Sequence, residues 1–186
     1  MTITAFSSTP RKRGNSDILT DHVLDGAKEA GATVEKIRLS DYSIGPCTAC
    51  DACRKSPDGT CVIDDDGNML LSKIQTSDTI ILASPVYFFA MSAQLKIFID
   101  RFYALGGDRY WSAFSGKRLG AIFTYEDPDP LVSGAANAAA TCRDLARFLN
   151  LELTGIIHVS CGAEAEVLNN SKALENAQDL GRKLAV

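Results

Sequence analysis

Residues 78–84 read Asp-Thr-Ile-Ile-Leu-Ala-Ser, and this short apolar run decides the fold class. A strand that is apolar at consecutive positions, rather than at every second position, is typical of a strand covered on both faces. Parallel strands need long crossover connections, and these usually place helices on both faces of the sheet. The stretch therefore indicates an α/β protein in which a parallel sheet lies between two layers of helices.

The rest of the chain alternates between short strand patterns and longer helical patterns. Strand patterns occupy residues 2–6, 33–39, 78–84, 119–125 and 152–160. Helical patterns occupy residues 15–30, 92–105, 133–149 and 170–184. Five strands joined by helices predict parallel pairing with right-handed crossovers, and so a doubly wound three-layer sandwich. No linker or repeat interrupts the pattern, so we expect a single domain over residues 1–186.

Composition and charge limit the classes of function. The chain has 186 residues, 46% of them hydrophobic, and a formal net charge of -4. An acidic balance argues against nucleic-acid binding, which depends on Lys and Arg contacts to phosphates. No apolar run is long enough to cross a membrane and no signal-peptide pattern follows Met1, so we expect a cytoplasmic protein with no membrane partner. In that reducing compartment, clustered cysteines more often bind metal or perform redox chemistry than form disulfides.

The loop after the first strand is a candidate phosphate site. Residues 7–16 read Ser-Ser-Thr-Pro-Arg-Lys-Arg-Gly-Asn-Ser. Small and hydroxylated residues let the backbone N–H groups point inward, and the next helix adds the positive end of its dipole. The loop contains neither a Walker A motif nor the Gly-x-Gly-x-x-Gly fingerprint. The alternative is an ordinary turn in which Asn15 or Ser16 caps the helix.

The loop after the third strand is rich in aromatic residues. Residues 84–89 read Ser-Pro-Val-Tyr-Phe-Phe, so three rings follow the strand where core packing should end. Such rings favour stacking of a flat conjugated ligand. Alternatively, one or two of them cover the sheet edge or a subunit contact.

These two loops, together with Lys-Ile-Phe-Ile-Asp-Arg at 96–101, resemble the NAD(P)H-dependent FMN reductase family of flavodoxin-like proteins. The resemblance covers about the first two-thirds of the chain and implies a flavodoxin-like fold with strand order 2-1-3-4-5. It implies that the FMN phosphate is bound by Ser7, Thr9, Arg11, Asn15 and Ser16. It also implies that the isoalloxazine ring is lined by Pro85, Val86, Tyr87 and Phe88. The family often has a glycine-containing loop after the fourth strand, whereas this chain has Tyr125 and acidic residues there, so the third wall departs from the pattern.

Four cysteines form a cluster in the loop 46–65. They are spaced C-x2-C-x2-C-x7-C, at Cys47, Cys50, Cys53 and Cys61. Three close ligands and a fourth further on resemble the run that binds a cubane cluster in bacterial ferredoxins, whereas structural zinc sites more often use two separated pairs. Within the family, this spacing resembles the iron–sulfur flavoproteins, which carry a [4Fe–4S] cluster beside FMN. The alternative is free or oxidised thiols in a reductase without a cluster.

The remaining cysteines and histidines carry weaker signals. We expect Cys142 and Cys161 to lie in core packing, and we find no partner for His22 or His158. We therefore assign no catalytic side chain, since a flavin would supply the redox chemistry.

The resemblance implies an oxidoreductase that passes electrons from NAD(P)H or a ferredoxin-like protein through FMN, with a [4Fe–4S] cluster, to a small-molecule or protein acceptor. The cluster would lie near the mouth of the flavin pocket, in the same subunit or across a subunit contact. Alternatives are an NADPH-dependent FMN reductase without a cluster, a flavodoxin-like electron carrier and a zinc-binding interaction module. We also expect a homodimer or homotetramer. Its contact would use Phe98, Arg101, Tyr103, Tyr110 and Trp111.

Overall fold

Five parallel strands form the centre of the computed structural model, which describes residues 1–56, 59–107 and 111–186. They are β1 (Thr2–Ser7), β2 (Thr33–Arg38), β3 (Thr79–Tyr87), β5 (Arg118–Tyr125) and β6 (Glu152–Ser160). Their order, β2-β1-β3-β5-β6, confirms the flavodoxin-like order 2-1-3-4-5 expected for the parallel strands. A two-residue strand that the sequence pattern did not indicate, β4 (Ala90–Met91), pairs antiparallel with the end of β3.

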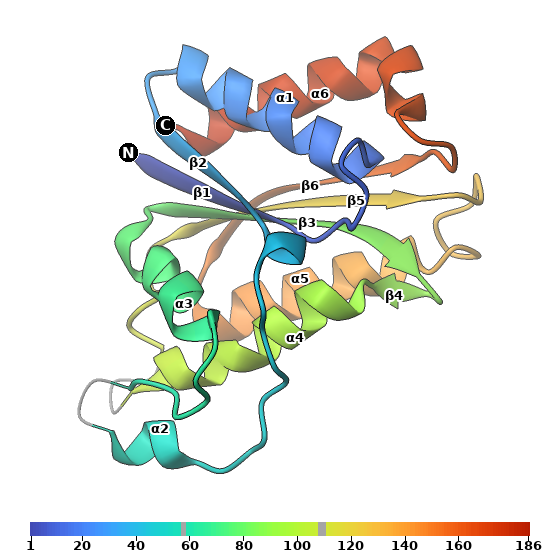
Figure 1. Cartoon of the computed structure of the whole chain (residues 1–186). Helices are drawn as coiled ribbons and strands as arrows, with labels where there is room; N and C mark the ends of the chain where they lie inside the picture. The colour runs from blue at the N-terminus through green and yellow to red at the C-terminus, as the bar shows by residue number, and fades with distance from the viewer. Residues whose placement is uncertain (57–58, 108–110) are drawn as a thin grey trace.

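Helices cover both faces of this sheet (Figure 1). One layer contains α1 (Asn15–Glu29) and α6 (Ser171–Leu184). The other contains α3 (Gly67–Thr76), α4 (Ala93–Arg101) and α5 (Ala135–Leu149). The helix expected over 92–105 is divided, because α4 ends at Arg101 and a 3₁₀ helix (Phe102–Gly106) follows. Shorter segments are α2 (Ala52–Lys55) and two further 3₁₀ helices, Leu39–Asp41 and Glu166–Asn169.

The central strand β3 contributes to a separate hydrophobic core on each face. Ile80 and Leu82 pack in the cluster that includes α3, α4 and α5 residues. Ile81 and Ala83 pack in the cluster that includes α1 and α6 residues. All four side chains are fully buried. This double burial explains why the run at 78–84 is apolar at consecutive positions.

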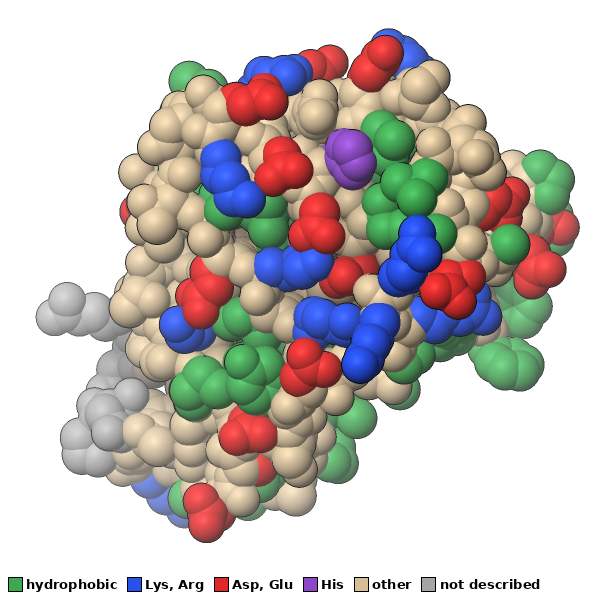
Figure 2. Space-filling view, turned by 45° about the horizontal axis from the view of Figure 1, so that its top comes forward, with side chains coloured by type: hydrophobic (Ala, Val, Ile, Leu, Met, Phe, Trp, Pro, Cys, Tyr) green, Lys and Arg blue, Asp and Glu red, His purple; other side chains and the backbone are tan. Residues whose placement is uncertain are grey.

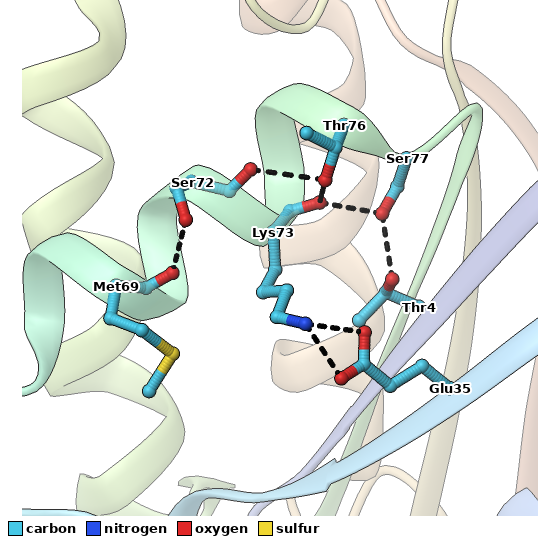
Figure 3. Close-up of polar contacts among 7 residues, drawn as sticks. All are labelled: Thr4, Glu35, Met69, Ser72, Lys73, Thr76 and Ser77. Carbon is cyan, nitrogen blue, oxygen red and sulfur yellow. Dashed lines mark hydrogen bonds and ion pairs between the residues drawn. The ribbon is translucent and has the colours of Figure 1, made fainter.

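Polar contacts fix the last turn of α3 to the sheet (Figure 3). The Lys73 ammonium bonds both oxygens of Glu35 on β2, at 2.8 and 3.0 Å. The Ser77 hydroxyl donates to the Lys73 carbonyl at 2.6 Å and shares a 2.7 Å hydrogen bond with the Thr4 hydroxyl on β1. Thr76 also bonds the Lys73 carbonyl, so side chains occupy carbonyls that a helix end leaves free. These contacts hold α3, and with it the end of the preceding cysteine loop, against β1 and β2.

Charges of both signs are mixed on the molecular surface. Figure 2 shows basic side chains across the middle of one face with acidic side chains among them. Lys36 illustrates the mixing, because its ammonium pairs with Asp17 at 3.1 Å and with Asp21 at 2.7 Å. In the described parts of the chain, no helix has both the length and the apolar character needed to cross a membrane.

Helices α1 and α6 touch backbone to backbone at two glycines. A Cβ atom added at Gly26 would overlap the carbonyl oxygen of Gln178 on α6. A Cβ atom added at Gly181 would overlap the carbonyl oxygen of Val23 on α1. Both positions therefore depend on the absence of a side chain.

We predict that Gly26→Ala destabilises the protein. Alanine forms helices better than glycine by about 1 kcal/mol, so helix propensity alone would give the opposite sign. The added methyl group must push α6 away, and overpacking of this kind costs about 1–3 kcal/mol. Chemical denaturation measures the change, and Asp25→Ala, at an exposed neighbouring position, should stay within about 0.5 kcal/mol of the parent. A Gly26→Ala variant more stable than the parent would contradict the close approach.

Candidate functional site

Loops from the carboxyl ends of four strands enclose a cavity of about 140 Å³. It is lined by Thr9, Arg11, Gly14, Asn15, Pro85, Val86, Tyr87, Thr124, Tyr125, Glu126, Cys161 and Gly162. Open α/β sheets bind ligands at this edge. A larger groove of about 600 Å³ runs along β6 and α6, but it gathers no residues from the central strands. We therefore take the smaller cavity as the candidate site.

The cavity contains most of the side chains that the sequence indicated. Those that line it are Thr9, Arg11, Asn15, Pro85, Val86, Tyr87 and Tyr125. Ser7 and Ser16 are buried but do not line it. Sequence reasoning missed Cys161 and Gly162 as lining residues, although their position directly after β6 could have indicated them.

The end of β1 and the start of α1 have unused hydrogen-bonding capacity. The helix begins after Gly14, and no side chain caps it. The hydroxyls of Ser7 and Ser16 are buried and have no hydrogen-bond partner within the described residues. A buried hydroxyl without a partner costs about 1–3 kcal/mol, so two of them indicate an absent acceptor. An oxyanion would accept hydrogen bonds from such hydroxyls and would also be stabilised by the positive end of the helix dipole.

Asn15 ties the loop after β6 to the start of α1. Its amide nitrogen donates to the Ala163 carbonyl at 2.8 Å, and its amide oxygen accepts the Val167 N–H at 3.1 Å. The Arg11 guanidinium also reaches this loop, at 3.4 Å from the Gly162 carbonyl oxygen. The Asn15 side chain therefore builds the cavity wall with groups that are already paired. The contribution of Asn15 to phosphate binding stays a prediction.

An aromatic turn with a strained backbone lies between β3 and β4. Phe88 and Phe89 have φ angles of 45° and 68°, as in a type I′ turn, which normally uses Asn-Gly. Left-handed backbone costs about 1–2 kcal/mol per residue other than glycine. The Asn137 amide holds the turn by donating to the Phe89 carbonyl at 3.1 Å. The turn directs Phe88 outward, where it is 97% exposed. We expected this ring to line the cavity, but it does not.

Two neutral groups with raised pKa values lie on the wall after β5 and β6. Burial raises the pKa of Tyr125, with smaller contributions from the nearby Asp129 and Cys161. Burial, with a smaller contribution from Glu166, raises the pKa of Cys161 to about 11. The Tyr125 hydroxyl lies 3.3 Å from Nδ1 of His158, a partner that the sequence did not reveal. Cys161 is buried, as expected for a packing residue, and also faces the cavity.

The four clustered cysteines lie away from this cavity. The chain descends from the end of β2 and places α2 beneath α3 and α4, whereas the cavity lies at the carboxyl ends of the strands (Figure 1). Cys47 and Cys50 are exposed, Cys53 is buried and Cys61 is half-buried. Across the residues that the structure describes, no three His, Cys, Asp or Glu side chains lie close enough together to hold a metal ion. The expected convergence of four thiols, and their place beside the flavin pocket of the same chain, are therefore not observed.

Aromatic stacking holds the cysteine loop against the body. The Arg54 guanidinium lies 4.2 Å from the ring centre of Tyr103 and 5.3 Å from that of Trp111. The Tyr103 hydroxyl donates to Asp51 at 2.9 Å. Tyr103 and Trp111, which we expected at a subunit contact, thus pack against Arg54 of their own chain. These contacts hold α2 in place.

The other residues that we expected at the subunit contact are Phe98, Arg101 and Tyr110. Phe98 and Arg101 are buried. Tyr110 lies outside the described residues. A homodimer or homotetramer remains a prediction, but the side chains of Phe98 and Arg101 offer it no surface.

An ion pair closes the base of the cysteine loop. The Arg101 guanidinium donates to Asp65 at 2.7 Å and to the Gly45 carbonyl at 3.0 Å. Asp65 also accepts the N–H groups of Gly45 and Gly67, each at 2.8 Å. Burial opposes ionisation of Asp65, but hydrogen bonds from Arg101, Gly45 and Gly67 outweigh it and lower the pKa of this carboxyl. One carboxylate therefore joins the two ends of the loop.

Comparison with known proteins places this geometry in a family. Residues 1–165 match the family described as NADPH-dependent FMN reductase. An iron-sulfur flavoprotein of Archaeoglobus fulgidus is 32% identical over 182 residues, covering 95% of this chain and 76% of that protein. An iron-sulfur flavoprotein of Methanocaldococcus jannaschii is 41% identical over 101 residues, covering 54% of this chain and 51% of that protein. The match thus spans about half the length of the second relative.

Solved structures confirm the fold. The NAD(P)H:quinone oxidoreductase from Methanothermobacter marburgensis superposes with a TM-score of 0.73, over 100% of this chain and 98% of that chain. The two sequences are 17% identical, so the likeness concerns the fold alone.

We predict that Asp65→Asn destabilises the protein by about 3 kcal/mol or more at neutral pH, because it leaves the buried Arg101 without its anionic partner. The folded-state pKa of Asp65 is lowered, so the contribution of the ion pair is present above the unfolded pKa of about 3.9. It is lost as the pH falls through the folded pKa. The stability difference between parent and variant should therefore shrink below about pH 4. Denaturant unfolding across pH measures it, with the exposed Asp64→Asn as control, and a difference independent of pH would count against the pair.

Proposed function

This chain belongs to the family of NADPH-dependent FMN reductases, and from that membership we propose that it binds FMN in the cavity at the carboxyl ends of the strands. We further propose that the bound flavin accepts electrons from NAD(P)H and passes them to a small-molecule or protein acceptor. FMN supplies this chemistry when bound, because it accepts a hydride and releases electrons singly or in pairs. The protein has to bind the flavin and orient it.

The two buried, unpartnered hydroxyls at the end of β1 and the start of α1 carry the proposal. Ser7 and Ser16 lack acceptors in the described residues, and the helix N-terminus beside them has no side-chain cap. The hydroxyl-bearing Thr9 and the cationic Arg11 line the adjoining cavity. A terminal phosphate would accept hydrogen bonds from the hydroxyls and the free helix N–H groups, and its charge would pair with Arg11. The loop has no dinucleotide fingerprint, which favours FMN over FAD.

The size and composition of the cavity suit one end of such a cofactor. Ligand pockets that enclose a whole small molecule have volumes of about 300–1,000 Å³, so a cavity of about 140 Å³ fits only a part. Pro85, Val86 and Tyr87 add apolar surface of the kind that a flat ring contacts. Tyr125 and Cys161 are protonated at neutral pH, and burial raises both pKa values further. The acidic residue Glu126 also lines the cavity, so this wall combines two neutral groups with one carboxyl group.

We extend the proposal to a [4Fe–4S] cluster on the cysteine loop. Its support is the C-x2-C-x2-C-x7-C spacing and the names of the two relatives, together with the chemistry of the donors. Burial raises the pKa of Cys53, with smaller contributions in the same direction from Cys61 and Cys50. A cluster exchanges single electrons when bound. Binding would require the loop to draw Cys47 and Cys50 inward.

An FMN reductase without a cluster is the second candidate function. The observation that favours it is the separation of the thiols, with Cys47 and Cys50 exposed while Cys53 is buried. The two candidates share the flavin site and differ only in what the cysteine loop binds.

We predict that Ser16→Ala weakens FMN binding without weakening the apoprotein. The hydroxyl has no partner in the described protein, so its removal should leave apoprotein stability within about 0.5 kcal/mol or raise it slightly. Loss of one hydrogen bond to a charged phosphate costs about 1.5–3 kcal/mol, so Kd should rise about tenfold or more. Fluorescence titration of apoprotein with FMN measures Kd, and Ser171→Ala at the exposed start of α6 is the control. An unchanged Kd would place the phosphate elsewhere.

We predict that Cys50→Ala abolishes iron binding and leaves FMN bound, because the two sites lie on separate segments. Iron, acid-labile sulfide and flavin are measured on protein purified without oxygen. Cys142→Ala is the matched control, since this buried core thiol lies outside the loop and burial raises its pKa to about 12. Parent protein that binds FMN but contains no iron or sulfide, even after anaerobic reconstitution, would establish the second candidate function instead.

A further inference from the structure

Arg38, the last residue of β2, has an unused hydrogen-bond donor. Its Nε atom is buried and has no hydrogen-bond partner among the described residues. The carboxylate of Asp41 lies 4.0 Å from Nε, which is beyond hydrogen-bond distance, and the Arg38 side chain is only 20% exposed. A buried guanidinium N–H group without an acceptor is costly, so it indicates an acceptor that the apoprotein does not supply.

The strand register places Arg38 beside Ser7. The two residues are partners across the parallel strands β1 and β2. Such strands lie about 4.8 Å apart, and partner residues direct their side chains to the same face of the sheet. Here it is the face covered by α1 and α6, because Ala5 and Val34, which share the alternation of Ser7 and Arg38, pack in the core on that face. Arg38 and the unpartnered hydroxyl of Ser7 are therefore neighbours on this face.

Lys36 shows that this face of β2 reaches the start of α1. It precedes Arg38 by two residues, so its side chain lies on the same face. Its ammonium contacts Asp17, in the first turn of α1, at 3.1 Å and Asp21 at 2.7 Å. Ser16, whose buried hydroxyl also has no partner in the described residues, directly precedes Asp17. Lys36 is thus already paired with two carboxylates, whereas Arg38 keeps a free donor near the two free hydroxyls.

We propose that Arg38 is a second cation for the flavin phosphate, in addition to Arg11, and that it makes the site select FMN over riboflavin. This inference rests on the proposed FMN site and assigns one more residue to it. The hydroxyls of Ser7 and Ser16 donate neutral hydrogen bonds, whereas a guanidinium donates charge-assisted bonds that are roughly twice as strong. Arg11 is exposed at the cavity, but the Arg38 side chain is mostly buried, where salt screens charge interactions less.

The test measures the affinity of the apoprotein for FMN and for riboflavin, which lacks the phosphate. Arg38→Gln should raise the Kd for FMN about tenfold or more, through loss of a charge-assisted hydrogen bond, and should leave the Kd for riboflavin within about twofold. Arg38→Lys keeps the charge but loses the planar fork, so its Kd for FMN should lie between the other two. Arg147→Gln removes an exposed positive charge on α5 as a control and should change neither Kd.

The outcomes separate this inference from the function on which it rests. Parent apoprotein that does not bind FMN would overturn both. Parent that binds FMN, with an Arg38→Gln variant that binds it equally well, would overturn the role of Arg38 alone. Equal losses of affinity for FMN and riboflavin would show that Arg38 supports the fold rather than the phosphate, and would also refute the inference. If Arg38→Gln does not fold, Arg38→Lys decides: a loss of affinity confined to FMN supports the inference, and any other result refutes it.

Discussion

Burial of β3 on both faces is the constraint on which the rest of the structure depends. Its side chains alternate between two cores, so helices must cover both sides of the sheet. Covering helices in turn require crossover connections, which place the β1, β3 and β5 exits at one edge. The phosphate-type loop, the aromatic turn and Tyr125 meet at that edge because of this topology. The location of the cavity therefore follows from the order of the strands and does not depend on which residues line it.

The helices that cover the sheet also shape the cavity. Asn15 belongs to the first turn of α1, yet its amide is bonded to the loop that leads into α6. Farther along the same pair of helices, Gly26 and Gly181 let the two backbones touch. The wall after β6 is thus positioned by α1 and α6 together. A change in the packing of α1 against α6 would therefore shift the wall after β6 through the hydrogen bonds of Asn15.

Periodicity of apolar residues was sufficient to predict the parallel strands, whereas their order and the candidate cavity residues followed from the resemblance to the reductase family. Both failed where the decisive contact is long-range or conformationally unusual. Phe88 faces outward because the turn adopts positive φ angles that Phe-Phe rarely takes. The side chain of Asn15 is engaged by partners almost 150 residues away in sequence. The position of the cysteine loop depends on the stacking of Arg54 on Tyr103 and Trp111. The spacing of the cysteines in the sequence cannot reveal such stacking.

The attachment of the cysteine loop has a consequence for the exposure of its thiols. Cys53 lies in one apolar core and Cys61 packs against it, and the rest of the loop is held by an ion pair at its base and by a cation stacked on two rings. The sheet, by contrast, is held by two apolar cores that do not include Cys47 or Cys50. Opening the loop is therefore a sub-global event that costs much less free energy than unfolding the sheet. The loop can therefore open while the sheet stays folded, so exposure of its thiols to solvent is an event separate from unfolding.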